Sequence, residues 1–148
     1  MAKKRSDRLK LVQELAERKK KQADQYLAES RQQVQQGEVT LQQLEQYIAE
    51  YQRRLISVGQ TGVNIAELTK IQQFIEKLTA TMRQHKESMK VNEEQLERVK
   101  AHWQQSYGHL KAMERLTETA EQKEQAEAEK ALQKTLDERS QLKRSNFI

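Results

Sequence analysis

Residues 57–64 read Ser-Val-Gly-Gln-Thr-Gly-Val-Asn, and this short stretch separates two long segments that carry the same hydrophobic repeat. Gly59 and Gly62 can adopt positive φ, so either residue can end a helix or turn the chain. The stretch is too short for a domain linker but long enough to reverse the chain direction. We therefore predict a turn at about residues 58–63.

Both flanking segments place residues at a strict 3–4 spacing, and most of these residues are apolar. The upstream series is Leu27, Ser30, Val34, Gly37, Leu41, Leu44, Ile48, Tyr51, Leu55 and Val58. The downstream series is Leu68, Ile71, Ile75, Leu78, Met82, His85, Met89, Asn92, Leu96, Val99, Trp103, Ser106, Leu110 and Met113. A sustained 3.5-residue repeat keeps such residues on one stripe of a helix, which is the requirement for a coiled coil. We call this stripe the seam.

The expected helices have recognisable start signals. Asn64 followed by Glu67 has the spacing of an Asn-led capping box, so the second helix is predicted over about 64–140. Ser6 is a weaker start signal for the first helix, which is predicted over about 6–57.

If the helices fold back on each other, seam residues should pair at a constant sum of residue numbers. Placing Val58 opposite Leu68 also places small Gly37 opposite Met89 and small Ala23 opposite Trp103. Such volume compensation is what close packing requires. The same register pairs Leu55 with Ile71, Tyr51 with Ile75, Ile48 with Leu78, Leu44 with Met82, Leu41 with His85, and Ser6 with Ala120. Residues from about 121 onward are left without a partner in the chain.

The predicted fold class is therefore all-α: a single long antiparallel two-helix coiled-coil hairpin with an unpaired C-terminal helical extension, forming one domain over residues 1–148. The composition agrees, with 35% hydrophobic residues, 33% charged residues and no proline. No segment resembles a membrane span or a signal peptide. The absence of cysteine suits the cytosol, so we expect a soluble, cytoplasmic monomer without membrane insertion.

Basic residues are concentrated at the N-terminus. Residues 1–21 contain nine lysines and arginines against three acidic residues, whereas the whole chain has a net charge of +5. A solvated basic end, a docking end for an acidic protein partner, and a site for nucleic acid or anionic lipid are three interpretations of this asymmetry. No nucleic-acid-binding motif accompanies it, so we expect no nucleic-acid partner.

The sequence offers no chemistry for catalysis. A two-helix hairpin has no concave pocket where reactive groups could converge, and Gly59-Gln-Thr-Gly62 lacks the ending of a phosphate loop. His102 and His109 lie about two turns apart, too far to chelate one metal ion, and His85 lies on the seam as a register-setting polar residue. We expect a non-enzyme without metal or cofactor.

Aromatic residues gather near the turn. Tyr47 and Tyr51 lie one helical turn apart, and Phe74 falls across from them in the predicted register. Tyr51 belongs to the seam, where core packing explains it. Tyr47 and Phe74 lie one position off the seam, where side chains remain half exposed and can anchor a partner.

The segments Leu44-Glu-Gln-Tyr47-Ile-Ala-Glu-Tyr51 and Gln73-Phe74-Ile75-Glu-Lys-Leu78, followed by His85, resemble the flagellar export protein FliJ family over essentially the whole chain. The resemblance implies a component of the flagellar type III export apparatus, similar to the central stalk of rotary ATP synthases. It also implies that the termini insert into the ring of the export ATPase FliI, that the turn-side end contacts the export gate protein FlhA, and that the protein lies at the inner face of the membrane at the flagellar base.

By position, the resemblance implies a gate-contact patch, which we call the turn-side patch: Leu44, Tyr47, Tyr51, Phe74, Leu78 and His85. Thr40 and Thr81 depart from the family pattern at its edge. The basic end that would contact the ATPase ring comprises Lys3, Lys4, Arg5, Arg8 and Lys10. In this context His85 is contact surface as well as seam.

Three functional hypotheses follow. The first is a stalk that activates the ATPase ring and couples it to the gate. The second is an export chaperone, or an escort for export chaperones, that uses its unpaired tail as a helix-in-groove surface. The third is a structural coiled coil that self-assembles through the tail.

Overall fold

The computed structural model describes residues 4–62 and 64–146, and in these residues it contains two helices. Helix α1 spans Arg5–Gln60 and helix α2 spans Ile65–Asn146. The prediction of an all-α helical hairpin is confirmed. Helix α1 ends slightly beyond its predicted limit near residue 57, and α2 continues past residue 140.

The turn between the helices uses the signals found in the sequence. Gly62 has a φ of 71°, a conformation that glycine adopts without steric cost. The Thr61 hydroxyl donates to the Val58 carbonyl oxygen at 3.1 Å and so covers one of the last acceptors of α1. At the start of α2, the Asn64 side-chain oxygen accepts a hydrogen bond from the Ala66 amide at 3.2 Å.

The contacts between the helices fall into two compact units. Unit 1 contains the described residues of Met1–Gln22 and Gln104–Ile148, and unit 2 is Ala23–Trp103. Each unit is described by itself below. That the chain acts as one domain stays a prediction.

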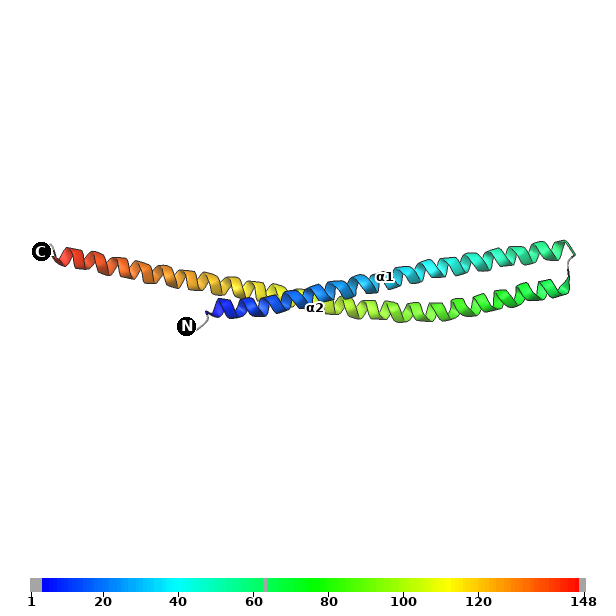
Figure 1. The fold of residues 1–148 in the computed structure, drawn as a ribbon, viewed down its shortest axis with the longest axis horizontal. Coiled ribbons are helices and arrows are strands. Elements are labelled where there is room, and N and C mark those ends of the chain that lie inside the picture. Colours follow the sequence, from blue (N-terminus) through cyan, green and yellow to red (C-terminus); the bar gives the residue numbers. More distant parts are fainter. Residues whose placement is uncertain (1–3, 63, 147–148) are drawn as a thin grey trace. The chain divides into compact units, whose positions relative to one another are not determined.

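In unit 2, α1 and α2 run antiparallel from the turn (Figure 1). The predicted seam residues are buried or half-buried throughout this unit. A Cβ atom at Gly37 would lie 3.3 Å from Cγ of Met89, so glycine makes room for this methionine as the register predicts. His85 was predicted opposite Leu41, and its Nε2 lies 2.7 Å from the carbonyl oxygen of Gly37, one turn before Leu41 in α1. The His85 ring can approach this carbonyl oxygen because Gly37 has no side chain that would block it.

In unit 1, the same 3–4 spacing continues through smaller and more polar residues. The α1 residues on the seam are Ser6, Leu9, Gln13, Ala16 and Lys20, and all are buried or half-buried. Across from them, Thr117 and Ala120 are buried, and the Thr117 hydroxyl donates to the Met113 carbonyl oxygen within its own helix. The seam of α1 therefore reaches back to Ser6, although hydrophobicity alone traced it only to Leu27.

The expectation that residues from about 121 onward lack a partner is wrong for the first turn of that segment. Glu124 accepts two hydrogen bonds from Ser6, and Glu121 forms an ion pair with Lys10 at 2.9 Å. A glutamate side chain is long enough to reach one turn beyond the layer in which its backbone lies. Within the described part of the chain, every residue from 125 to 146 is exposed, so the unpaired extension, here called the tail, begins after Glu124.

Candidate functional site

The turn-side patch in unit 2 is built around an aromatic pair. The ring centroids of Tyr51 and Phe74 lie 4.6 Å apart with a 54° tilt between the planes, which is a favourable geometry for two aromatic rings. The guanidinium carbon of Arg54 lies 5.4 Å from the Tyr51 ring centroid, in the range of a cation–π contact. The Tyr51 ring is therefore contacted by both helices of the unit: by Phe74 of α2 and by Arg54 of α1.

Two members of the patch remain exposed because they lie one residue off the seam. The exposed fraction is 53% for Tyr47 and 41% for Phe74. Leu44, Tyr51 and Leu78 are half-buried seam residues. The structure thus brings Tyr47, Tyr51 and Phe74 together, with Tyr47 and Phe74 as outer surface and Tyr51 as support.

His85, the sixth predicted residue, is half-buried and tied to the backbone of α1. A carbonyl oxygen can only accept, so the 2.7 Å contact with Gly37 requires the proton to be on Nε2. This hydrogen bond joins the two helices and orients the ring. His85 is therefore mainly a seam residue. Only the part of its ring that does not contact α1 is exposed to solvent.

The sequence-based patch does not include two of its neighbours, Glu50 and Arg54. In the structure these residues line a small surface pocket together with Tyr47 and Tyr51. The sequence does contain a pattern that could have identified them. Tyr47 and Tyr51, and likewise Glu50 and Arg54, are spaced i,i+4, and this spacing places all four residues on adjacent parts of one helix surface.

The basic end lies in unit 1, and its residues have different environments. Lys3 is outside the described residues, whereas Lys4, Arg5, Arg8 and Lys10 are exposed. The hydrogen bond and the negative charge of Glu121 raise the pKa of Lys10. Lys10 therefore already has an acidic partner within the chain.

Glu124 covers the first turn of α1. Its Oε1 accepts from the Ser6 amide at 3.1 Å and its Oε2 accepts from the Ser6 hydroxyl at 2.6 Å. These hydrogen bonds lower the pKa of the Glu124 carboxyl. A helix N-terminus has unsatisfied amides and a partial positive charge, so a carboxylate is well matched to it.

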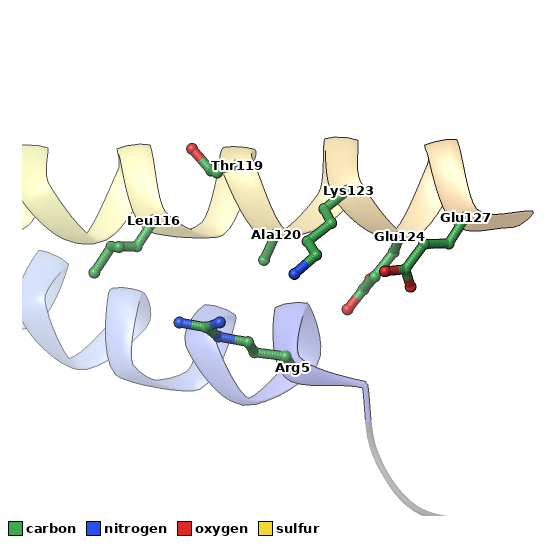
Figure 2. Close-up of a pocket in the computed structure, with 7 residues that line it drawn as sticks. All are labelled: Arg5, Leu116, Thr119, Ala120, Lys123, Glu124 and Glu127. Carbon is green, nitrogen blue, oxygen red and sulfur yellow. The ribbon is translucent and has the colours of Figure 1, made fainter.

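A surface pocket of about 240 Å³ lies next to this contact (Figure 2). Figure 2 shows Leu116, Ala120 and Lys123 of α2 directed toward α1, with Arg5 extending beneath them. Glu124 and Glu127 line one end of the pocket. The pocket therefore combines an apolar floor with two cationic and two acidic side chains.

Over residues 4–62 and 64–146, no group of three or more histidine, cysteine or acidic side chains is arranged to hold a metal ion. In the same residues, neither helix has a stretch long and apolar enough to cross a membrane. The arrangement offers surfaces for binding other molecules.

Comparison with known proteins identifies the family. No curated protein and no solved structure matches the chain. The model of the family described as flagellar FliJ protein matches residues 5–146, nearly the whole chain. That family consists of components of the flagellar export apparatus and is not known as a family of enzymes. The chain therefore belongs to the flagellar FliJ protein family.

Proposed function

We propose that this protein is a non-enzymatic stalk of the flagellar type III export apparatus. In this proposal its terminal end, unit 1, inserts into the ring of the export ATPase FliI, and its turn-side patch contacts the export gate protein FlhA. The protein would act on the cytoplasmic side, at the inner face of the membrane at the flagellar base.

The observation that carries the proposal is the half-exposed aromatic surface of Tyr47 and Phe74. Both rings stand on helices that pack against each other, and Phe74 is held by its contact with Tyr51. Rigid, partly exposed aromatic residues lose little side-chain entropy when a partner covers them, which is why they recur as interface anchors. The turn-side patch is thus suited to binding a protein surface.

The terminal end supports the other half of the proposal. Its first turn is tied to α2 through Ser6 and Glu124, so the start of α1 is held in place. A stalk that turns or pushes within a ring needs such an ordered end. Arg5 and Arg8 remain on its surface and can meet acidic side chains of the ring.

The direct experiment measures ATP hydrolysis by the export ATPase of the same organism with and without the purified protein. The proposal expects stimulation that saturates at a fixed ratio of protein to ATPase hexamer. A variant carrying Tyr47→Ala and Phe74→Ala should stimulate the ATPase normally but lose binding to the gate protein. Absence of both stimulation and binding to either partner would contradict the proposal.

An export chaperone, or an escort for export chaperones, is the second candidate, and the tail favours it. Leu132, Leu136 and Leu142 are all exposed on a helix with no opposing helix among the described residues. Helices of this kind bind in grooves of partner proteins. Purified export substrates should then aggregate less in its presence. Stoichiometric binding to empty chaperones would indicate an escort, and a chain lacking residues 125–148 should lose either activity.

A further inference from the structure

Unit 1 has two sides that differ sharply in charge. On α1, one set of residues lies just before seam positions and another just after them, and each set repeats at the 3–4 spacing of the seam. The first set is Arg5, Arg8, Val12, Leu15 and Lys19, and the second is Asp7, Lys10, Glu14, Glu17 and Lys21. Residues at this spacing form one continuous face of a helix.

The surface pockets assign the matching residues of α2 to each side. Arg5 shares a pocket with Leu116 and Lys123. Lys10 shares a different pocket with Glu14 and Glu17 of α1. From α2 that second pocket is lined by Glu114, Glu118 and Glu121. The first pocket is lined by Arg5, Lys123 and apolar side chains, with Glu124 and Glu127 at one end. The second pocket is lined by five glutamates and one lysine. With Arg8 and Lys19, the first side carries an excess of cations, whereas the second pocket carries an excess of carboxylates.

The basic and apolar side exposes aliphatic side chains that the fold does not cover. The exposed fraction is 43% for Val12, 52% for Leu15 and 43% for Leu116. Leu11 is also exposed, on the part of α1 opposite the seam. Isolated exposed aliphatic residues are common on proteins, but a group of them rimmed by charged side chains marks an interaction surface. We name Arg5, Arg8, Val12, Leu15, Lys19 and Leu116 the basic–apolar face.

We propose that the basic–apolar face binds an acidic amphipathic helix of a protein partner. The apolar centre takes the apolar stripe of that helix, and an apolar side chain enters the pocket above Leu116 and Ala120. Arg5, Arg8 and Lys19 pair with carboxylates beside the stripe. This inference rests on the proposed function only in taking unit 1 as the partner-binding end of the protein.

Charge complementarity indicates which kind of partner binds and on which side of unit 1 it binds. An acidic helix is attracted to a face with three cations at its ends, and the five glutamates on the opposite side repel it. A nucleic acid would find no aromatic side chain to stack on in this face.

The inference also separates residues that sequence alone grouped together. Arg5 and Arg8 lie on the basic–apolar face, whereas Lys10 lies on the acidic side and is bound to Glu121. We therefore expect Arg8 to contribute to partner binding and Lys10 to contribute to the structure of unit 1. Arg8→Glu should therefore weaken partner binding, whereas Lys10→Glu should break the ion pair with Glu121 and destabilise unit 1.

The first test is photocrosslinking in living cells with p-benzoylphenylalanine in the full-length chain. The photoreactive residue replaces Leu15 or Leu116 on the basic–apolar face, or Glu14 or Glu118 on the acidic side. We expect the first pair to crosslink to a peptide rich in Asp and Glu with apolar residues at i,i+3 and i,i+4, and the second pair not to. Equal crosslinking on both sides, no crosslinking on the basic–apolar face, or capture of lipid or of unpatterned peptides would overturn the inference.

The second test uses the purified export ATPase of the same organism as the probe. Arg8→Glu and Leu15→Ala should each weaken its binding, the charge reversal by about tenfold at low salt and by less at high salt. Glu14→Arg is the matched control, because it changes an exposed residue of the same helix on the opposite side and should leave binding unchanged or tighter. Circular dichroism of each variant confirms that the helices are intact. Equal loss of binding in Glu14→Arg would count against the assignment of the side.

A third measurement uses phosphatidylglycerol vesicles. If the protein binds these vesicles tightly, if Arg8→Glu abolishes that binding, and if no protein crosslinks to the basic–apolar face, then the face binds a membrane surface. The inference of an acidic helix would then be wrong. If the crosslinked acidic helix belongs to a protein other than the ATPase, the inference stands and the ATPase contact in the proposed function fails. If the ATPase is stimulated normally by Arg8→Glu and Leu15→Ala, and Leu15 and Leu116 crosslink to no acidic helix, the proposed function stands and the inference fails.

Discussion

Unit 1 and unit 2 use the same 3–4 repeat but fill it with different side chains. Unit 2 packs large apolar residues against small ones, such as Met89 against Gly37. Unit 1 has Ser6, Ala16, Leu110, Thr117 and Ala120 at its buried positions, and of these only Leu110 is a large apolar residue. With less apolar area to bury, unit 1 adds the Ser6–Glu124 hydrogen bonds and the Lys10–Glu121 ion pair.

The difference predicts unequal sensitivity to mutation and to solvent. Packing of apolar side chains is nearly independent of pH and salt, and its loss is costly. Exposed ion pairs contribute little and are screened by salt. Unit 2 should therefore be the more stable part of the chain, and unit 1 the part that solution conditions and partners can modulate. The following predictions test that contrast.

The largest effect is expected for Trp103→Ala in unit 2. Trp103 is half-buried, and its indole Nε1 donates to Asp24 Oδ1 at 2.6 Å. Loss of the ring leaves a cavity beside fully buried Ala23 and should lower the free energy of unfolding by about 3 kcal/mol or somewhat less. Thermal unfolding followed by circular dichroism measures this. Trp103→Phe should recover most of the loss, and if it does not, the hydrogen bond matters more than the packing.

Gly37→Leu should have the next largest effect. A side chain at this position meets Met89 and displaces the His85 ring from the Gly37 carbonyl oxygen. Overpacking of this kind costs about 1–3 kcal/mol. The control is Gly108→Leu, because no atom lies within 4 Å of a Cβ placed there. That variant should raise the melting temperature slightly, since leucine has a higher helix propensity than glycine.

Tyr47→Ala and Phe74→Ala should separate binding from stability within unit 2. Both residues lie off the seam and are half-exposed, so helicity and thermal unfolding should change much less than in Trp103→Ala. Binding to the gate protein should weaken by about 1–2 kcal/mol for each, as expected for interface anchors. Titration calorimetry and melting curves on the same samples make the comparison. If these variants melt as early as Trp103→Ala, the patch is core and the assignment of a binding surface is wrong.

The smallest effect is a pH dependence confined to unit 1. The pKa of Glu124 is lowered by its hydrogen bonds with Ser6, so the stabilisation is present above the ordinary pKa of a glutamate and is lost as the pH falls through the lowered value. The pKa of Lys10 is raised by Glu121, so its contribution is present below the ordinary pKa of a lysine and is lost as the pH rises through the raised value. Both contacts are intact near neutral pH.

Hydrogen exchange of the Ser6 amide is the appropriate measurement. Protection should decrease on acidification, and Glu124→Gln should remove most of that decrease. Glu127→Gln is the control, because Glu127 lines the same pocket but does not bond to Ser6. Equal responses of the two variants would mean that general charge, and not the specific contact, protects this turn.

Much of the fold followed from local patterns. The 3–4 spacing predicted both helices and the residues of their contact, because a 3.5-residue repeat specifies one face of a helix regardless of what lies opposite. The glycine-bearing turn and the Asn64 cap were likewise readable, since both depend on residues a few positions apart. The aromatic pair Tyr51 and Phe74 was predicted to meet because a register anchored at the turn accumulates little error so close to it.

The contacts of polar side chains far from the turn were not predicted. Ser6 was expected beside Ala120, and both are buried, but the hydrogen bonds between Ser6 and Glu124 were not foreseen. The first part of the seam was missed because Gln13 and Lys20 do not appear as core residues by hydrophobicity. Long polar side chains can bury their stems while their polar ends reach solvent or a neighbouring layer, and no rule of spacing says which they will do.

The sequence by itself determined the helices, the turn, the seam and the position of the aromatic patch, because each depends on short-range spacing or on intrinsic backbone preference. Only the tertiary structure decided which side of the seam each charge of unit 1 faces, how Glu121 and Glu124 are used, and that His85 bonds to the backbone of Gly37. These features depend on how far a flexible side chain reaches across to the other helix, and that distance is set only when the two helices pack.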